Sequence, residues 1–138
     1  MEKSCGTILF TEVDGERRYV LVRNPGSGNC AFPKGHTEGE ETEIETALRE
    51  TWEETCVTPE IIPGFRETLS YKTDKGADKT VAYFPAVYRG QVPCKNPDFE
   101  ELELYILPYE QARAALTHDS AKKLLDKAEA FLEARRGA

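Results

Sequence analysis

The sequence predicts one domain, over residues 1–138, of mixed α/β (α+β) class, with a β-sheet sandwiched between helices. The length of 138 residues suits a single domain. A chain of this size buries about two-thirds of the surface that it exposes when unfolded, which is enough for a core of its own. The expected elements follow the order strands, helix, strands, helix, and this order indicates a layered sheet-and-helix architecture.

The first half of the chain is expected to contain a hairpin and one helix. Residues 5–10 and 18–22 are rich in β-branched and aromatic side chains, which favour strands. Asp14-Gly15 between them is a typical hairpin turn. Residues 24–29 (NPGSGN) have the composition of a loop. Residues 42–55 predict a helix, because Thr42 suits its N-cap and Pro59 follows shortly after its end.

The second half is expected to contain a second hairpin, a further strand and two helices. Residues 65–72 and 80–88 predict the hairpin, with 73–79 as its loop, and 101–107 predict the further strand. Residues 108–116 predict a short helix, and the last helix begins near Asp119, a suitable N-cap. Its buried stripe follows at helical spacing and consists of Leu124, Leu125, Ala128, Phe131 and Leu132.

Charge and cysteine usage exclude several classes of partner. The net charge of −7 argues against polymeric nucleic acid, whose binding depends on lysine and arginine. It allows a small phosphorylated ligand if a bound metal supplies positive charge. The four cysteines form no C-x-x-C pair, and the N-terminus lacks a basic-then-apolar leader. No apolar run reaches the length of a membrane span. We therefore expect a cytoplasmic protein, a monomer or weak dimer, with reduced thiols and no membrane partner.

Residues 35–57 are the most informative segment, because a glycine-punctuated loop there leads into an acidic helix. At about 100° per residue, Glu50, Glu53 and Glu54 gather on one face, across from the apolar and neutral residues. A solvated charged face is the alternative, but such a face normally mixes signs, and lysine is absent from residue 35 to residue 71. Two carboxylates about 4 Å apart repel by roughly 4 kcal/mol at an effective dielectric of about 20. The pattern therefore predicts a cation among them.

Hard oxygen ligands with room for water and phosphate oxygens suit Mg²⁺, with Mn²⁺ as an alternative. Divalent ions held by carboxylates beside an open cleft most often serve phosphoryl chemistry. We therefore expect Mg²⁺ as the cofactor and a small phosphorylated molecule as the substrate.

The same segment resembles the Nudix box, G-x5-E-x7-R-E-U-x-E-E-x-G-U, where U is a bulky apolar residue. The residues in register are Gly35, Glu41, Arg49, Glu50, Glu53, Glu54 and Val57. Thr51 replaces the first apolar residue, and Cys56 replaces the second glycine. A left-handed backbone is usual just past a helix end, and it would cost a cysteine about 1–2 kcal/mol. We expect either this strain at Cys56 or a different turn.

Within the Nudix family the chain is most similar to the diadenosine tetraphosphate hydrolase branch. The similarity rests on residues 32–36 (FPKGH), 45–51 (ETALRET), 64–71 (GFRETLSY) and 79–84 (KTVAYF). It implies the Nudix fold, with a mixed sheet between helices. It also implies a pyrophosphohydrolase that cleaves a nucleoside diphosphate linked to another moiety by attack of water on phosphorus. Asymmetric hydrolysis of diadenosine tetraphosphate to ATP and AMP is the expected reaction.

The resemblance further implies roles for box residues. Glu50 is favoured as the general base, with Glu100 or Glu103 as candidates for an extra ligand or base, and Arg49 orients Glu41 or Glu53. The implied catalytic residues are Arg49, Glu50 and Glu53. The implied metal ligands are the carbonyl of Gly35 and the carboxylates of Glu50, Glu53, Glu54 and Glu100.

Five further residues are candidates for contacts with the substrate: Lys34, His36, Tyr71, Lys79 and Tyr83. The lysines and His36 would contact phosphate. Either tyrosine could stack on adenine, which is worth about 1–3 kcal/mol. The alternatives are solvent exposure for Lys34, a structural hydrogen bond for His36, and packing for the tyrosines.

Two other functional hypotheses remain open. The box residues bind only the pyrophosphate and the metal, so they do not determine the rest of the substrate. The substrate could instead be ADP-ribose, a nucleoside triphosphate, an inositol pyrophosphate or 5′-triphosphorylated RNA. A nucleotide-sensing domain that does not hydrolyse its ligand is the second alternative. An eroded box would be its sign, whereas every box carboxylate is present here.

Overall fold

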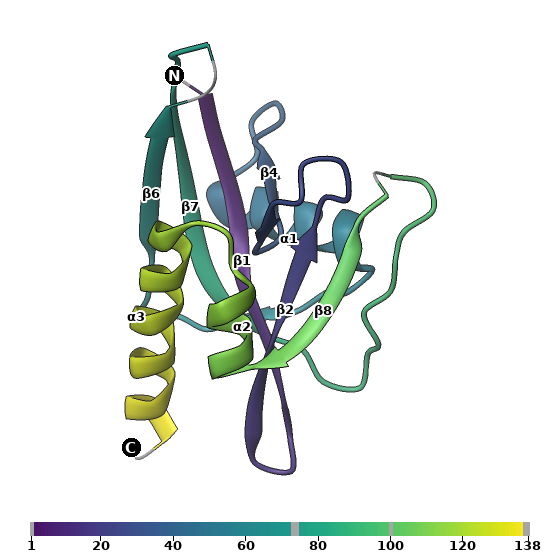
Figure 1. Cartoon of the computed structure of the whole chain (residues 1–138), viewed down its shortest axis with the longest axis vertical. Coiled ribbons are helices and arrows are strands. Elements are labelled where there is room, and N and C mark those ends of the chain that lie inside the picture. Colours follow the sequence, from purple (N-terminus) through teal and green to yellow (C-terminus); the bar gives the residue numbers. More distant parts are fainter. Residues whose placement is uncertain (1, 73–74, 100, 137–138) are drawn as a thin grey trace.

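A computed structural model describes residues 2–72, 75–99 and 101–136, apart from the side chains of Glu2 and Tyr71. Within these residues, eight strands form one mixed sheet and three helices pack against it (Figure 1). The predicted α+β class, with a sheet between helices, is confirmed. The elements in chain order are β1 (Glu2–Val13), β2 (Glu16–Arg23), β3 (Cys30–Ala31), β4 (Lys34–His36), α1 (Glu43–Thr55), β5 (Glu60–Ile61), β6 (Glu67–Lys72), β7 (Asp78–Val87), β8 (Glu103–Pro108), α2 (Tyr109–Ala115) and α3 (Asp119–Arg136).

Strand β1 lies at the centre of the sheet and organises its neighbours. It pairs in parallel with β7 and antiparallel with β2 and β4. The remaining pairs are antiparallel: β3 and β8 flank β2, while β5 and β6 flank β7. Both predicted hairpins are confirmed, and the turn between β1 and β2 has positive φ at Asp14 (53°) and Gly15 (80°). This combination at two successive residues matches the twist of the flanking strands.

The two faces of the sheet are covered by different helices. In Figure 1, α2 and α3 lie in front of the sheet and α1 lies behind it. Successive side chains of a strand point to opposite faces. Ile8 and Phe10 of β1 therefore join a core cluster with Leu124 and Leu125 of α3, whereas Cys5 joins a separate cluster with Ala47 of α1. Burial on both faces explains the apolar run Ile8-Leu9-Phe10 in the middle of this strand.

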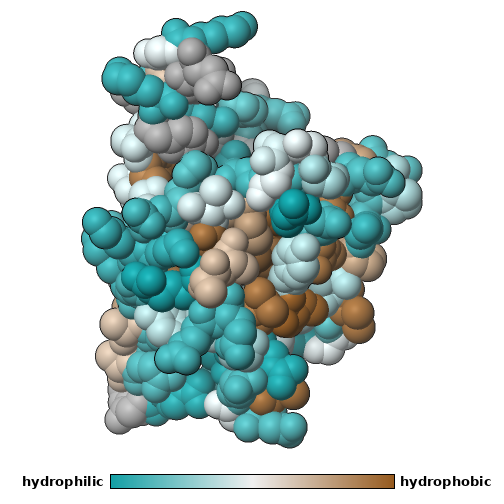
Figure 2. Space-filling model, viewed as in Figure 1, coloured by the Kyte–Doolittle hydropathy of each residue, from teal (hydrophilic) through white to brown (hydrophobic). Residues whose placement is uncertain are grey.

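The predicted stripe of α3 is confirmed for its four aliphatic members, all of which are buried: Leu124, Leu125, Ala128 and Leu132. Phe131 is only partly buried and packs against the ring of Phe65. Figure 2 shows hydrophobic side chains gathered near the middle of the face that it displays. Tyr105 and Ile106 of β8 are exposed, and as neighbours in a strand they point to opposite faces of the sheet. Among the described residues, the helices are too short or too polar to cross a bilayer.

Candidate active site

The start of α1 is fixed by its own capping residues and by two basic side chains. The side chain of Thr42 accepts from the N–H of Glu45, and the side chain of Glu45 accepts from the N–H of Thr42. Such a capping box satisfies two helix-end donors, and the predicted N-cap is confirmed. Glu43 in the first turn pairs with Arg66 and Lys3, each at 2.7 Å. The acidic helix therefore begins at a defined point of the sheet.

The end of α1 carries backbone strain. Cys56 has φ 62° and ψ 18°, and its N–H donates to the carbonyl of Trp52 at 2.8 Å. The expected left-handed backbone at Cys56 is therefore present, and the alternative of a different turn is not. The side chain is accommodated at a cost of about 1–2 kcal/mol relative to a right-handed conformation.

The buried face of α1 explains the unusual threonine of the box. Thr51 is fully buried, and its hydroxyl lies 2.7 Å from the hydroxyl of Thr7 on β1. A buried hydroxyl is tolerated when it has a hydrogen-bond partner. Thr51 therefore docks the helix on the sheet through a polar contact at a position where an apolar residue is usual.

Two glycines bring β4 against β1 and α1. A Cβ on Gly6 would collide with the carbonyl of Pro33 and with Lys34, so the close approach of β4 to β1 requires glycine there. A Cβ on Gly35 would overlap the carboxylate of Glu50. The backbone of Gly35 therefore lies directly against Glu50, the arrangement expected if both contribute to one site.

Arg49 lies among the acids of this site. Its guanidinium also donates to the carbonyl of His36 at 2.8 Å. The four carboxylates within 3.1 Å of it belong to Glu38, Glu41, Glu50 and Glu53. Glu41 and Glu53 were the alternative partners expected for Arg49, and it contacts both. One positive charge facing four negative charges leaves the group with a surplus of three.

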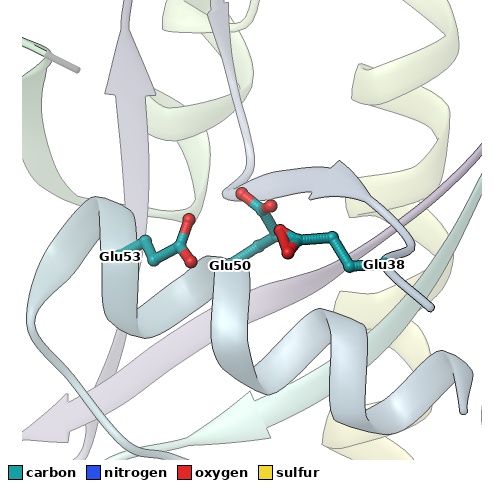
Figure 3. Close-up of side chains that lie close together, drawn as sticks. All are labelled: Glu38, Glu50 and Glu53. Carbon is teal, nitrogen blue, oxygen red and sulfur yellow. The ribbon is translucent and has the colours of Figure 1, made fainter. Parts of the chain in front are cut away.

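Three of these carboxylates converge closely enough to hold a cation. Oxygens of Glu38, Glu50 and Glu53 lie within 4.8 Å of one another. Figure 3 shows Glu50 and Glu53 extending from α1 and Glu38 reaching toward Glu50 from the segment between β4 and α1. The site suits Mg²⁺, because it offers three hard oxygen donors, a surplus of negative charge and the adjacent backbone of Gly35. Glu38 was not predicted, since it lies outside the helix and no periodicity points to it.

The surroundings shift the pKa values of two box carboxylates in opposite directions. Burial raises the pKa of Glu50 above its usual range; the hydrogen bond from Arg49 opposes this shift, and the charge of Glu53 adds to it. The hydrogen bond from Arg49 lowers the pKa of Glu41 to about 2, assisted by the N–H of Glu38. A carboxylate with a raised pKa is suited to accept a proton, whereas Glu41 stays ionised and holds Arg49.

Of the other predicted acids, Glu54 and Glu103 lie outside this cluster. One oxygen of Glu54 accepts from the N–H of Lys34 at 3.3 Å, and Glu54 lies outside the three-carboxylate group. Glu103 pairs with Arg23 at 2.6 Å. Glu100 lies outside the described residues.

The structure describes the side chains of four of the five predicted substrate contacts. Lys34 is half-buried on β4 beside the acids. His36 is exposed, and its Nδ1 lies 3.4 Å from the hydroxyl of Ser4, a contact of the structural kind. Lys79 of β7 pairs with Tyr71 of β6 in the sheet. The side chain of Tyr71 is not among those that the structure describes.

Tyr83 requires a correction. Its side chain is 4% exposed, belongs to the core on the α3 side, and meets the ring of Phe32 edge-on. A buried ring offers no face to a nucleotide base. The alternation of β7 points it away from α1, so packing explains Tyr83 and stacking on adenine does not.

A small pocket of about 140 Å³ adjoins the acids. Lys34 and Glu54 form one side of it, and the loop of residues 24–29 forms another. Asn29 lines this pocket, and its Oδ1 atom is buried without a hydrogen-bond partner among the described residues. An acceptor of this kind can receive a ligand N–H. The sequence indicated a loop here, and nothing in its pattern singled out Asn29.

Comparisons with known proteins agree with this geometry. The NUDIX domain family model matches residues 5–128. The asymmetrical bis(5′-nucleosyl)-tetraphosphatase of Rattus norvegicus is 36% identical over 94 residues, which are 61% of this chain and 63% of that protein. Its Caenorhabditis elegans counterpart is 32% identical over 104 residues, 72% of this chain and 70% of that protein. The match thus spans less than two thirds of the length of the rat relative.

Solved structures are similar over a larger share of the chain. The binary complex of a C. elegans Ap4A hydrolase superposes with a TM-score of 0.89 at 26% identity, covering 97% of this chain and 99% of that one. The NUDIX domain of Shewanella oneidensis NrtR in a cocrystal with ADP ribose gives 0.74 at 20% identity, covering 94% and 87%, a likeness of fold alone.

Proposed function

The chain belongs to the NUDIX family, and on that premise we propose that it is a Mg²⁺-dependent pyrophosphohydrolase that cleaves diadenosine tetraphosphate asymmetrically. One water is consumed, and the products are ATP and AMP. The observation that carries the proposal is the convergence of Glu38, Glu50 and Glu53 around Arg49. The similarity to asymmetrical tetraphosphatases of rat and nematode supports the choice of substrate.

The metal ligands in this proposal are carboxylates and one carbonyl. Glu38 joins the set expected from the resemblance, and that set consists of the Gly35 carbonyl, Glu50, Glu53, Glu54 and Glu100. Bound Mg²⁺, or Mn²⁺ in its place, would neutralise phosphate charge and favour ionisation of the attacking water.

The protein residues supply positioning and a proton acceptor. Arg49 holds Glu41, Glu50 and Glu53 through hydrogen bonds of 2.7 to 2.9 Å, so their carboxylates are oriented before the substrate arrives. Glu50 is the proposed acceptor of the proton of the attacking water. Orientation in advance lowers the barrier because less reorganisation is needed during the reaction.

We place the nucleotide across β4, with one base in the pocket next to Glu54. Lys34 at its edge contacts phosphate. The unpartnered Oδ1 of Asn29 accepts a hydrogen bond from the amino group of adenine. His36 and Lys79 remain candidates for the phosphate chain, and Tyr71 remains a candidate for stacking. The four free thiols support a cytoplasmic setting, and the proposed form is a monomer or weak dimer.

The test is an assay of the purified protein with Mg²⁺ and a panel of diadenosine tetraphosphate, ADP-ribose and nucleoside triphosphates, with products separated by ion exchange. Equal amounts of ATP and AMP are expected from diadenosine tetraphosphate. Two ADP molecules, or no turnover by folded protein, would overturn the proposal. Tight binding without product would instead support a sensing domain.

A matched pair of variants tests the site. Glu53→Gln keeps the shape of the side chain, removes a charge from the cluster, and is expected to lower kcat at least about 100-fold, equivalent to about 2.7 kcal/mol. Glu40→Gln makes the same change at an exposed box residue outside the cluster and should leave kcat unchanged. Equal activity of the two variants would refute the assignment.

A further inference from the structure

A larger groove lies at the opposite end of β1 from the box. The box contacts β1 where residues 4–6 pair with β4, whereas the groove is lined by residues beyond Leu9, at the lower end of the molecule in Figure 1. It lies between the β1–β2 hairpin and the last turns of α3. Its volume is about 630 Å³, in the range of pockets that hold small organic ligands.

The groove has a basic lining in an acidic protein. Four arginines line it, together with a single acid, Glu12. They are Arg17, Arg89, Arg135 and Arg136. The lining is therefore basic, although the chain as a whole has a net charge of −7.

Two of these arginines have acidic partners and two do not. Arg136 pairs with Glu12, and Arg17 pairs with Glu129 and Glu133 on α3. Among the described residues, Arg89 and Arg135 have no acid within ion-pair distance. The guanidinium of Arg135 lies over the ring of Phe131 at 5.6 Å. Two uncompensated positive charges thus face one groove.

Arg17 adds a second sign of a missing partner. Its side chain is 4% exposed, and its Nε has no hydrogen-bond acceptor among the residues that the structure describes. Buried polar atoms are almost always paired in folded proteins.

The rest of the lining is apolar, with side chains of Phe10, Ile62, Val87 and Leu132. We propose that the groove binds a small organic phosphate. The apolar, planar part of this ligand lies on these side chains, and its phosphomonoester group lies between Arg89 and Arg135. Two guanidiniums match the charge of about −1.5 to −2 that a phosphomonoester carries at pH 7. The guanidinium fork suits phosphate oxygens. This site is separate from the carboxylate site, which needs a cation to hold phosphate.

The test uses phenyl phosphate as the probe in isothermal titration calorimetry, with EDTA present so that the carboxylate site holds no metal. The wild-type chain is expected to bind one equivalent, more weakly in 0.5 M salt. Arg89→Gln combined with Arg135→Gln should weaken binding at least tenfold. This variant breaks no ion pair among the described residues, and circular dichroism would verify that it folds.

The matched control is Arg18→Gln combined with Arg113→Gln, which removes the same charge at exposed sites away from the groove. It should bind phenyl phosphate like the wild type, as should Glu53→Gln. Inorganic phosphate and phenol should each bind at least tenfold more weakly than phenyl phosphate. Absence of binding, equal weakening in both double variants, or equal affinity for phenol or inorganic phosphate would overturn the proposal.

Discussion

The buried contact between Thr7 and Thr51 predicts a double-mutant cycle of defined size. Their hydroxyls lie 2.7 Å apart, and both residues are fully buried between β1 and α1. Replacing either one by valine leaves the other hydroxyl buried without this partner, which costs about 1–3 kcal/mol of unfolding free energy. Replacing both removes two polar groups and leaves two apolar groups of the same shape, which is close to neutral.

The coupling energy is the loss of the double variant minus the sum of the two single losses. Its expected magnitude is therefore about 2–6 kcal/mol. Urea unfolding of the four proteins, followed by far-UV circular dichroism, measures it, provided that the slope with denaturant stays constant across the set. If the double variant loses the sum of the two single losses, the hydroxyls act independently and the reasoning is wrong.

The Thr51→Val variant also distinguishes the expectation from the box pattern from the expectation from the structure. The box pattern alone favours an apolar residue at position 51, so by that criterion Thr51→Val improves the sequence. The structure predicts that Thr51→Val lowers stability, because the buried hydroxyl of Thr7 on β1 would lose its hydrogen-bond partner. Only the combined Thr7→Val and Thr51→Val variant should recover wild-type stability.

Three further predictions concern single positions. Gly35→Ala should lower kcat at least about tenfold with little change in Tm, because its Cβ would displace the Glu50 carboxylate; unchanged turnover would contradict that contact. Cys56→Gly should raise stability by about 1 kcal/mol, or about 4 °C in Tm, because glycine adopts the left-handed backbone freely; a lower Tm would show that the cysteine side chain contributes more than its strain. Hydrogen bonds from Arg66 and Lys3 lower the pKa of Glu43 to about 2 from 4.5. The ionised Glu43 therefore stabilises the folded chain fully above about pH 4.5, and this contribution is lost as the pH falls toward 2. Glu43→Gln should therefore lose about 0.5–1 kcal/mol at pH 7 and progressively less below pH 4.5 in urea unfolding, and a pH-independent loss would rule out this linkage.

The sequence predicted the long elements because each has a local pattern. β-Branched and aromatic side chains on either side of Asp14-Gly15 marked the first hairpin, and the capping signal at Thr42 marked the start of α1. The strands β3, β4 and β5 were missed because each has only two or three residues. Their pairing depends on contacts distant in sequence, such as Gly35 with Cys5. No local pattern records such a contact.

The site was predicted as far as helix geometry reaches. The helical wheel placed Glu50, Glu53 and Glu54 on one face, but it could not show that β4 lies beside Glu54 and draws it toward the Lys34 N–H. Nor could it show that Glu38 reaches the cluster from a segment outside the helix. Tyr83 illustrates the same limit, since the side of the sheet on which it lies depends on the register of β7 with β1.

The charge surplus around Arg49 predicts how Mg²⁺ affects stability in the absence of any substrate. Four carboxylates share one guanidinium, so the folded chain gains a favourable contact when a cation enters, and the unfolded chain has no such cluster. A ligand that binds only the folded state adds about 2.7 kcal/mol at a concentration 100 times its Kd. Thermal unfolding in saturating Mg²⁺ should then occur about 10 °C higher than in EDTA. Glu53→Gln should lose most of this shift and Glu40→Gln should keep it, and because no catalysis is measured, the result locates the cation independently of the reaction. An equal shift in both variants would place the cation outside the cluster of Glu38, Glu50 and Glu53.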